Sequence, residues 1–178
     1  MASEILPPFG NQNKGAKATP ATGTITEKTW GGDNRYFTEI NIDDLSLIAT
    51  TNASKGDGKL IYTLPAGNII IKSAAMKIGI VGTGSANAAD TPDLGIGTVV
   101  ATGAVAVLSG TGTFENIMTG QTVSACDGTA VLNSVDTILA IASSAAHTIY
   151  LNIADGWAGV DAGMLASGRV IIEWCFMD

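Results

Sequence analysis

The chain has 178 residues, of which 46% are hydrophobic and 14% charged, and its formal net charge is −7. This acidic balance disfavours nucleic acid as a partner, because affinity for nucleic acid comes largely from lysines and arginines that neutralise phosphates. No run of about 18 or more uncharged apolar residues predicts a membrane helix, and no basic segment followed by an apolar run predicts a signal peptide. The 22 glycines, together with many small and β-branched residues, favour an all-β domain over a helical bundle.

Residues 1–34 are rich in Pro, Gly, Asn, Thr and Lys and show the period of neither a strand nor a helix. A segment of this composition cannot bury enough apolar surface to fold alone. We therefore expect an extended N-terminal arm over residues 1–34 and a single β domain over residues 35–178. Phe9 and Trp30 are the large aromatics of the arm, and such residues are common interface anchors. They favour an arm ordered against a neighbour over a solvated terminus.

The character of the sequence changes at residue 35, where RYFTEINI alternates. Tyr36 and Ile40 lie on one face of the expected strand, and Phe37 and Asn41 lie on the other. The alternation continues over residues 43–51, and residues 52–58 are rich in turn-forming side chains. This region therefore predicts strand, strand and loop.

Residues 58–82, GKLIYTLPAGNIIIKSAAMKIGIVG, contain two apolar segments on either side of Leu64, Pro65, Ala66 and Gly67. Proline lacks an N–H and cannot sit inside a sheet ladder, and glycine tolerates the positive φ of a tight turn. The segment predicts two buried strands, with small residues at 73–75 where the second strand bends, bulges or changes sheet.

The remaining apolar runs are short and are separated by Gly, Ser, Thr or Asp. They predict strands at residues 94–101, 104–108, 112–118, 130–133, 137–142, 148–154 and 169–177, with one helical turn inside the connection at 155–168. About nine or ten strands without crossover helices indicate a β-sandwich, and a jelly roll is the best specific expectation.

The sequence offers little nucleophile or nucleotide chemistry. Residues 79–84, GIVGTG, lack the G-x-G-x-x-G spacing of a nucleotide loop. His147 is the one histidine, and no G-x-S-x-G elbow accompanies it, so a turn or interface histidine is expected. Cys126 and Cys175 are expected to be reduced, buried thiols. We expect neither an enzyme nor a bound cofactor.

Carboxylates leave two alternatives open. Asp90 and Asp93, or Asp155 and Asp161, lie in expected loops where they could bind calcium, although neither pair follows the EF-hand pattern. Solvated loop carboxylates are the favoured interpretation.

Sugar chemistry is the other alternative. Paired acids for glycoside cleavage would have to come from Glu39, Glu115 and Glu173 on expected strands, where few aromatics surround them. Four rings could instead line a shallow sugar-binding face, although core packing is favoured for them: Tyr62, Tyr150, Trp157 and Trp174.

Three segments taken together resemble small virion proteins of tailed bacteriophages, especially those of marine and cyanobacterial hosts. The segments are YTLPAGNIIIKSAAMKIGI, DTPDLGIGTVVATGAVAVLSGTGTFENIM and HTIYLNIADGWAGVDAGMLASGRVIIEW, and the likeness covers residues 58–175. Members of this group are capsid decoration (cement) proteins or related head-fibre bases.

The resemblance implies a jelly-roll-like sandwich that forms homotrimers on the virion surface, with an N-terminal arm gripping the major capsid protein. We expect the contact residues at the arm and at its junction with the body to be Phe9, Trp30, Tyr36 and Phe37. The alternative function is a carbohydrate-binding or host-attachment module on a head fibre or tail.

Overall fold

The computed structural model describes residues 15–47, 55–82, 87–109, 112–143, 145–157 and 163–177. These residues form β-strands and connections without a helix. The strands are β1 (Ala16–Lys17), β2 (Thr24–Gly32), β3 (Arg35–Leu47), β4 (Lys55–Leu64), β5 (Gly67–Gly82), β6 (Asp93–Gly97), β7 (Met118–Thr122), β8 (Val131–Ser143), β9 (His147–Asp155) and β10 (Met164–Phe176).

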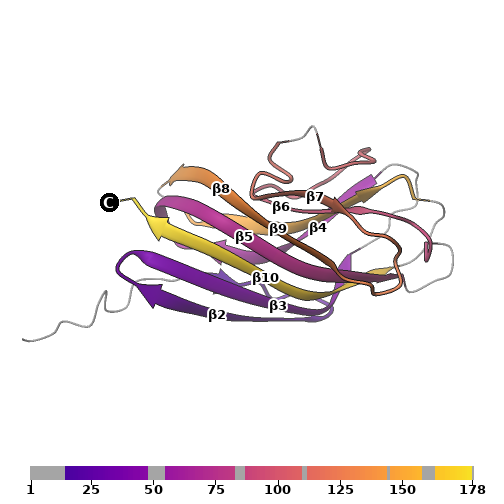
Figure 1. Cartoon of the computed structure of the whole chain (residues 1–178), viewed down its shortest axis with the longest axis horizontal. Helices are drawn as coiled ribbons and strands as arrows, with labels where there is room; N and C mark the ends of the chain where they lie inside the picture. Colours follow the sequence, from indigo (N-terminus) through magenta and orange to yellow (C-terminus); the bar gives the residue numbers. More distant parts are fainter. Residues whose placement is uncertain are drawn as a thin grey trace, which may run out of the picture.

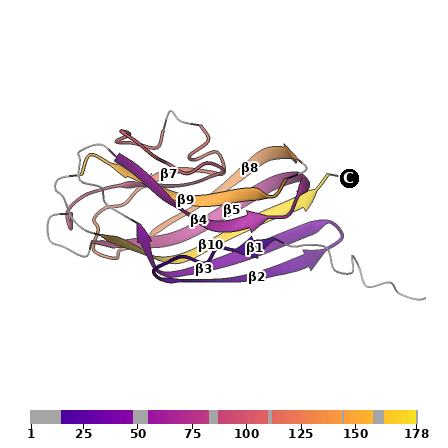
Figure 2. The ribbon, with the colours of Figure 1, turned by 180° about the vertical axis from the view of Figure 1, so that it is seen from behind.

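The strands build two antiparallel sheets that pack face to face (Figures 1 and 2). The first sheet has the order β1-β4-β9-β6-β7, and the second has the order β2-β3-β10-β5-β8. Strand β3 pairs with β10, β4 with β9, β5 with β8 and β6 with β7, so each pair encloses the next along the chain. This nested pairing is the path of a jelly roll, and the predicted β-sandwich is confirmed.

Alternating apolar side chains explain why the two sheets face one another. In β10, Met164, Ala166, Val170, Ile172 and Trp174 are all buried, while the intervening side chains point outward. Strand β5 repeats the pattern from the neighbouring position in the sheet. One continuous core therefore fills the space between the sheets.

The LPAG segment carries the chain from one sheet to the other. Strand β4 ends at Leu64 in the first sheet, and β5 begins at Gly67, with φ of 137°, in the second. The predicted irregularity of β5 is present in its pairing with β10, where Lys72 is an extra residue between Ile71 and Ser73. It is a bulge within one sheet, because β5 stays in the second sheet along its whole length.

Residues 24–32, which the sequence placed in the arm, form an edge strand of the second sheet. Strand β2 pairs with β3 along its length, and Asp33 and Asn34 form the turn between them with φ of 50° and 60°. Positive φ at both central residues is the geometry of a two-residue type I′ hairpin. The side chain of Asn34 also bonds the backbone N–H and carbonyl of Phe176, which fixes the hairpin to the end of β10.

The connection between β6 and β7 differs from the sequence expectation. The predicted strands at 104–108 and 112–118 are absent from the described residues there, and β7 begins only at Met118. Apolar side chains of this connection, including Leu108 and Phe114, form a small second cluster with Ala154 of β9. The helical turn expected within 155–168 is also wrong for its described part, because β10 begins at Met164.

Candidate interaction surface

The side of the second sheet that faces away from the core is the candidate site, and we call it the outer face. Its exposed aromatic pair comes from the β2–β3 hairpin, where Trp30 lies opposite Phe37 in register. The two rings stack with centroids 5.8 Å apart and planes inclined by 16°. Trp30 remains 39% exposed although it is a large apolar side chain. Tryptophan in such a position is typical of a protein interface.

Two cations flank this aromatic pair. The Arg35 guanidinium carbon lies 5.2 Å from the centroid of the Phe37 ring, and the Lys28 ammonium nitrogen lies 6.0 Å from the Trp30 ring. Cations at these distances are attracted by the negative faces of the rings. We call Lys28, Trp30, Arg35 and Phe37 the aromatic patch.

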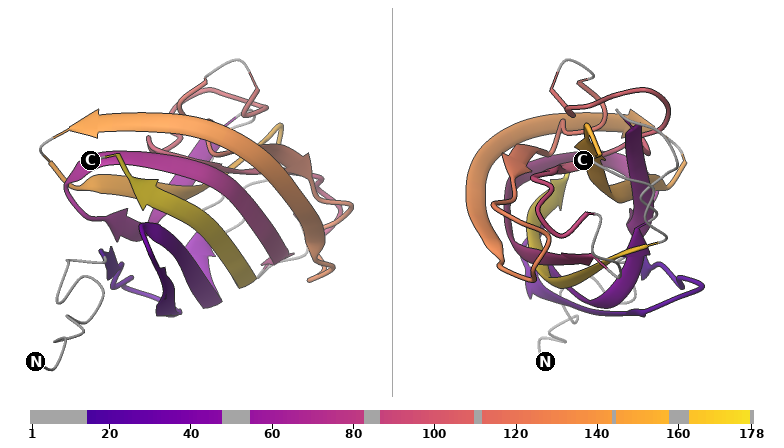
Figure 3. Two further views of the ribbon diagram at one scale, coloured as in Figure 1. Left: turned by 60° about the vertical axis from the view of Figure 1, so that its left-hand side comes forward. Right: turned by 90° about the vertical axis from the view of Figure 1, so that its right-hand side faces the viewer.

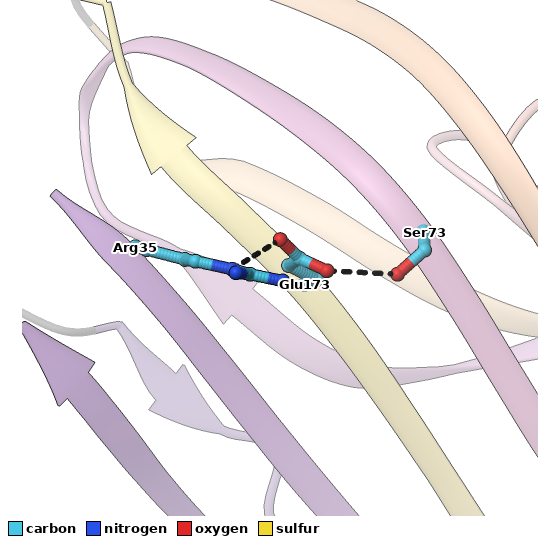
Figure 4. A network of polar contacts seen from close by, with 3 residues as sticks. All are labelled: Arg35, Ser73 and Glu173. Carbon is cyan, nitrogen blue, oxygen red and sulfur yellow. Dashed lines mark hydrogen bonds and ion pairs between the residues drawn. The ribbon is translucent and has the colours of Figure 1, made fainter.

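Glu173 of β10 joins the aromatic patch to the centre of the sheet (Figure 4). Arg35 Nε donates to Glu173 Oε1 at 2.7 Å, and Ser73 Oγ donates to Glu173 Oε2 at 3.3 Å. The hydrogen bond from Arg35 is the main reason that the pKa of Glu173 lies below its ordinary value, and the charges of Arg35 and Lys72 add to this effect. Glu173 therefore holds Arg35 beside the ring of Phe37.

We predict that Glu173→Gln lowers stability at neutral pH by less than about 1 kcal/mol, because Arg35 is largely exposed. A carboxyl whose pKa is lowered by folding stabilises the protein above its unfolded pKa, near 4.3. That contribution disappears as the pH falls through the lower pKa of the folded state. Denaturant unfolding at several pH values should show the two proteins converging below about pH 4. In a protein that already carries Arg35→Gln, adding Glu173→Gln should change the free energy of unfolding by less than it does in the unaltered chain. If the unaltered and Glu173→Gln proteins already had equal stability above pH 6, the lowered pKa assigned to Glu173 would be wrong.

A second polar group lies further along the outer face. Arg169 Nε is 3.1 Å from Asn41 Oδ1 and 3.6 Å from Glu39 Oε1. Beside it is a hollow of about 520 Å³, which is lined by Lys77 and Arg169 and by small residues such as Ala75. With Lys28 and Arg35, these cations lie on one face of a chain whose net charge is −7. Glu39 and Glu173 lie on the same face, where they pair with Arg169 and Arg35.

The structure separates the four residues that the sequence proposed as contacts. Trp30 and Phe37 come together in the aromatic patch. Tyr36 points to the opposite side of β3, where it is 3% exposed and stacks on Trp174 with centroids 4.6 Å apart. Tyr36 is thus a core residue, while Phe9 lies outside the described residues.

The rings considered for a sugar-binding face do not form one. Tyr62 and Trp174 are fully buried and Trp157 is 5% exposed, as the favoured expectation of core packing required, whereas Tyr150 is only partly buried. The candidate acids are also engaged elsewhere. Glu39 and Glu173 bind arginines on the outer face, and Glu115 accepts a hydrogen bond from the Gly120 N–H in the other sheet.

Two of the carboxylates considered for calcium, those of Asp90 and Asp155, lie near enough to the buried thiol of Cys126 to influence its pKa. Burial is the main reason that the pKa of Cys126 is raised to about 12, and the charges of Asp90 and Asp155 add to it. Burial likewise raises the pKa of Asp155, and Asp90 and Asp93 add to that shift. Within the described ranges no three His, Cys, Asp or Glu side chains are placed to hold a metal ion; Asp161 lies outside those ranges.

The remaining chemically distinctive side chains have structural positions. Cys126 and Cys175 are buried, as expected, and do not form a disulfide with each other. His147 is 8% exposed at the start of β9, and its Nε2 donates to the Gly67 carbonyl at 3.1 Å. This bond joins β9 to the first residue of β5. No helix in the described part of the chain has the length and apolar character needed to cross a membrane.

Comparison with known proteins gives structural neighbours only. No protein-family model and no curated protein sequence matches the chain. A chain of the cyanophage Pam1 capsid asymmetric unit aligns with a TM-score of 0.38 and 16% identity, over 96% of this chain and 99% of that chain. A chain of the infectious bursal disease virus Gx strain structure aligns with a TM-score of 0.27 and 14% identity, over 94% of this chain and 36% of its own length. Function must therefore be inferred from this chain's own residues.

Proposed function

We propose that this chain is a structural, non-enzymatic virion protein of a tailed bacteriophage. Its role is that of a decoration (cement) protein, which binds the outer shell of major capsid protein and stabilises it. Support comes from the likeness of residues 58–175 to small virion proteins, and from the jelly-roll path that the strands of the same region follow. The homotrimer implied by that likeness is part of the proposal.

The aromatic patch is the observation that carries the proposed contact. A cement protein stabilises a shell by burying surface across neighbouring subunits, and a few aromatic and arginine side chains supply most of such binding energy. Trp30 and Arg35 have these side chains, lie on one exposed face and are held in place by Phe37 and Glu173. The patch also lies on β2 and β3, near the beginning of the described chain.

Trp30→Ala is expected to weaken binding to empty shells of the parent phage's major capsid protein by about 30-fold. This corresponds to a hot-spot contribution of about 2 kcal/mol. Binding is measured by cosedimentation of the full-length chain with shells over a range of concentrations. Fold retention is checked by circular dichroism, because a partly exposed side chain on an edge strand contributes little to the core.

Two further proteins complete this experiment. Val107→Ala removes another exposed apolar side chain, 51% accessible and remote in sequence from β2 and β3, and should leave shell binding unchanged. Deleting residues 1–14 tests the arm without removing β1 or β2, whereas deletion to residue 30 would disrupt the second sheet. Equal binding by the Trp30→Ala protein and the unaltered chain would exclude the aromatic patch as the shell contact.

A further inference from the structure

The four edges of the two sheets differ in how well they resist pairing with another strand. Strand β1 has 2 residues and β7 has 5, so neither offers a long template. Strand β2 carries the adjacent charges of Glu27 and Lys28 and ends in two glycines. Strand β8 has 13 residues, lacks proline and glycine, and carries a single charge, that of Asp136. Short and charged edges prevent unwanted association, and β8 is neither short nor highly charged; its one irregularity is a bulge at residues 137–138, where it passes Lys72 of β5.

Exposed apolar side chains lie on the same strand. Leu132 is 75% exposed and Ile138 is 87% exposed, the two highest values among the exposed large hydrophobic side chains of the described residues. Leu132 is paired with Lys77 of β5, whose side chain is on the outer face. Alternation along β8 places Ile138 on that face too, together with Ser134 and Asp136. In the described residues β5 is the one strand that pairs with β8 along its length (Figure 3).

We propose that β8 is a self-association edge, which pairs antiparallel with β8 of a second copy of this chain about a two-fold axis at Val135. This register places Leu132 opposite Ile138 of the partner subunit, and Ser134 opposite Asp136 of the partner subunit. Opposed side chains of an antiparallel pair lie on the same face, with their Cβ atoms about 5 Å apart. Both exposed apolar side chains then gain an apolar neighbour, and the carboxylate faces a hydroxyl.

Other registers fit less well. An axis at Asp136 brings the two carboxylates of the dimer directly opposite each other, which is destabilising. An axis at residue 137 places each carboxylate opposite an isoleucine. An axis at Ile138 moves the second strand along residues 139–143. Leu139, Ala140 and Ile141 there border a hollow that is also lined by Thr98 and Asn116 of the connection between β6 and β7. The axis at Val135 uses residues 131–139 and ends where this hollow begins.

Such pairing joins the two second sheets into one continuous sheet that crosses the subunit boundary. The contact is isologous, since each copy presents the same edge, and it closes after two copies. It leaves the aromatic patch free because β2 and β8 are the opposite edges of the second sheet. It does not depend on the proposed function, and where trimers form it links one trimer to the next.

The assembly mass of the full-length chain tests the proposal. Light scattering after size exclusion should give an even multiple of the 18.1 kDa chain mass at micromolar concentration. Ile138→Lys should halve that mass, because an edge lysine opposes strand pairing. Val107→Lys places the same charge at an exposed valine outside β8 and should leave the mass unchanged. An odd multiple for the unaltered chain, or no change with Ile138→Lys, would overturn the proposal.

Cysteine crosslinking tests the register. Leu132→Cys and Ile138→Cys proteins, mixed and oxidised, should form a disulfide-linked dimer in higher yield than either protein alone. Preferential crosslinking of Ile138→Cys with itself would overturn the axis at Val135. Because both positions are exposed, the two cysteine substitutions should leave the melting temperature nearly unchanged. If either protein melts at a clearly lower temperature, the Ser134→Cys and Asp136→Cys proteins are used for the same test, since these positions also face each other in the proposed register.

Discussion

Trp174→Ala is expected to lower the free energy of unfolding by about 3–5 kcal/mol, the usual cost of removing a large buried aromatic side chain. Trp174 is fully buried in β10, which lies between β3 and β5 in the second sheet. Its ring stacks on Tyr36 at 4.6 Å and meets Phe176 edge-on at 5.5 Å. Its Nε1 donates to Thr38 Oγ1 at 2.9 Å. Alanine leaves a cavity at a place where rigid strands limit collapse.

The matched control is Trp30→Ala, which removes the same side chain from the outer face, where it is 39% exposed. We expect a loss below about 1 kcal/mol, because surface substitutions away from buried networks have small effects. Urea unfolding followed by circular dichroism measures both values. Similar losses for the two proteins would mean that Trp174 lacks the packing role assigned to it.

The second large effect is expected at Asn152, a fully buried polar residue of β9. Its Oδ1 accepts from the Ala101 N–H at 2.9 Å, and its Nδ2 donates to the carbonyls of Val99 and Phe114 at 2.9 and 2.7 Å. The Asn152 side chain therefore gives three backbone groups of the connection between β6 and β7 the hydrogen-bond partners that a neighbouring strand would otherwise supply. It holds both ends of that connection against the first sheet.

Asn152→Ala is expected to cost about 3–5 kcal/mol, because the buried Ala101 N–H and Phe114 carbonyl and the partly buried Val99 carbonyl lose their partner at about 1–3 kcal/mol each, and solvent entry offsets part of this. The connection should also become sensitive to limited proteolysis between residues 98 and 117. Asn116→Ala in the same connection is the control. Among the described residues its side chain bonds Thr98 alone, and it is less buried, so a loss near 1 kcal/mol is expected. Unchanged proteolysis of the Asn152→Ala protein would contradict its anchoring role.

The jelly roll could be predicted because its strands alternate and its connections are marked by turn-forming residues. Strand β2 was missed because it is an edge strand with a single fully buried side chain, Ile25, so its polar composition is that of an arm. The hairpin signal was nevertheless present, since Asp33 and Asn34 are residues that tolerate positive φ. The apolar run at 104–108 misled in the opposite direction. Only Leu108 of this run is buried, and Val107 is 51% exposed, so the apolar composition of the run does not reflect a buried strand.

Part of the candidate surface was also within reach of the sequence. Alternation requires that Tyr36 and Phe37 face opposite sides of β3, but it does not say which side is the core. The stacking of Trp30 on Phe37 depends on the register of the hairpin, and thus on the turn at Asp33 and Asn34. The bond from Arg35 to Glu173 joins residues that are 138 positions apart, so it follows from the fold and not from any local motif.

The central position of β10 has a consequence for how this protein is made. Strand β10 lies between β3 and β5, and its pairing with β3 joins Tyr36 to Trp174 across most of the chain. While a ribosome is still adding residues before 164, the β2–β3 hairpin and the β5–β8 pair have no strand to join them. Non-local pairing of this kind slows folding and leaves apolar strands open to aggregation. The sandwich therefore cannot close until β10 has been synthesised, and the strands before it stay incompletely paired until then.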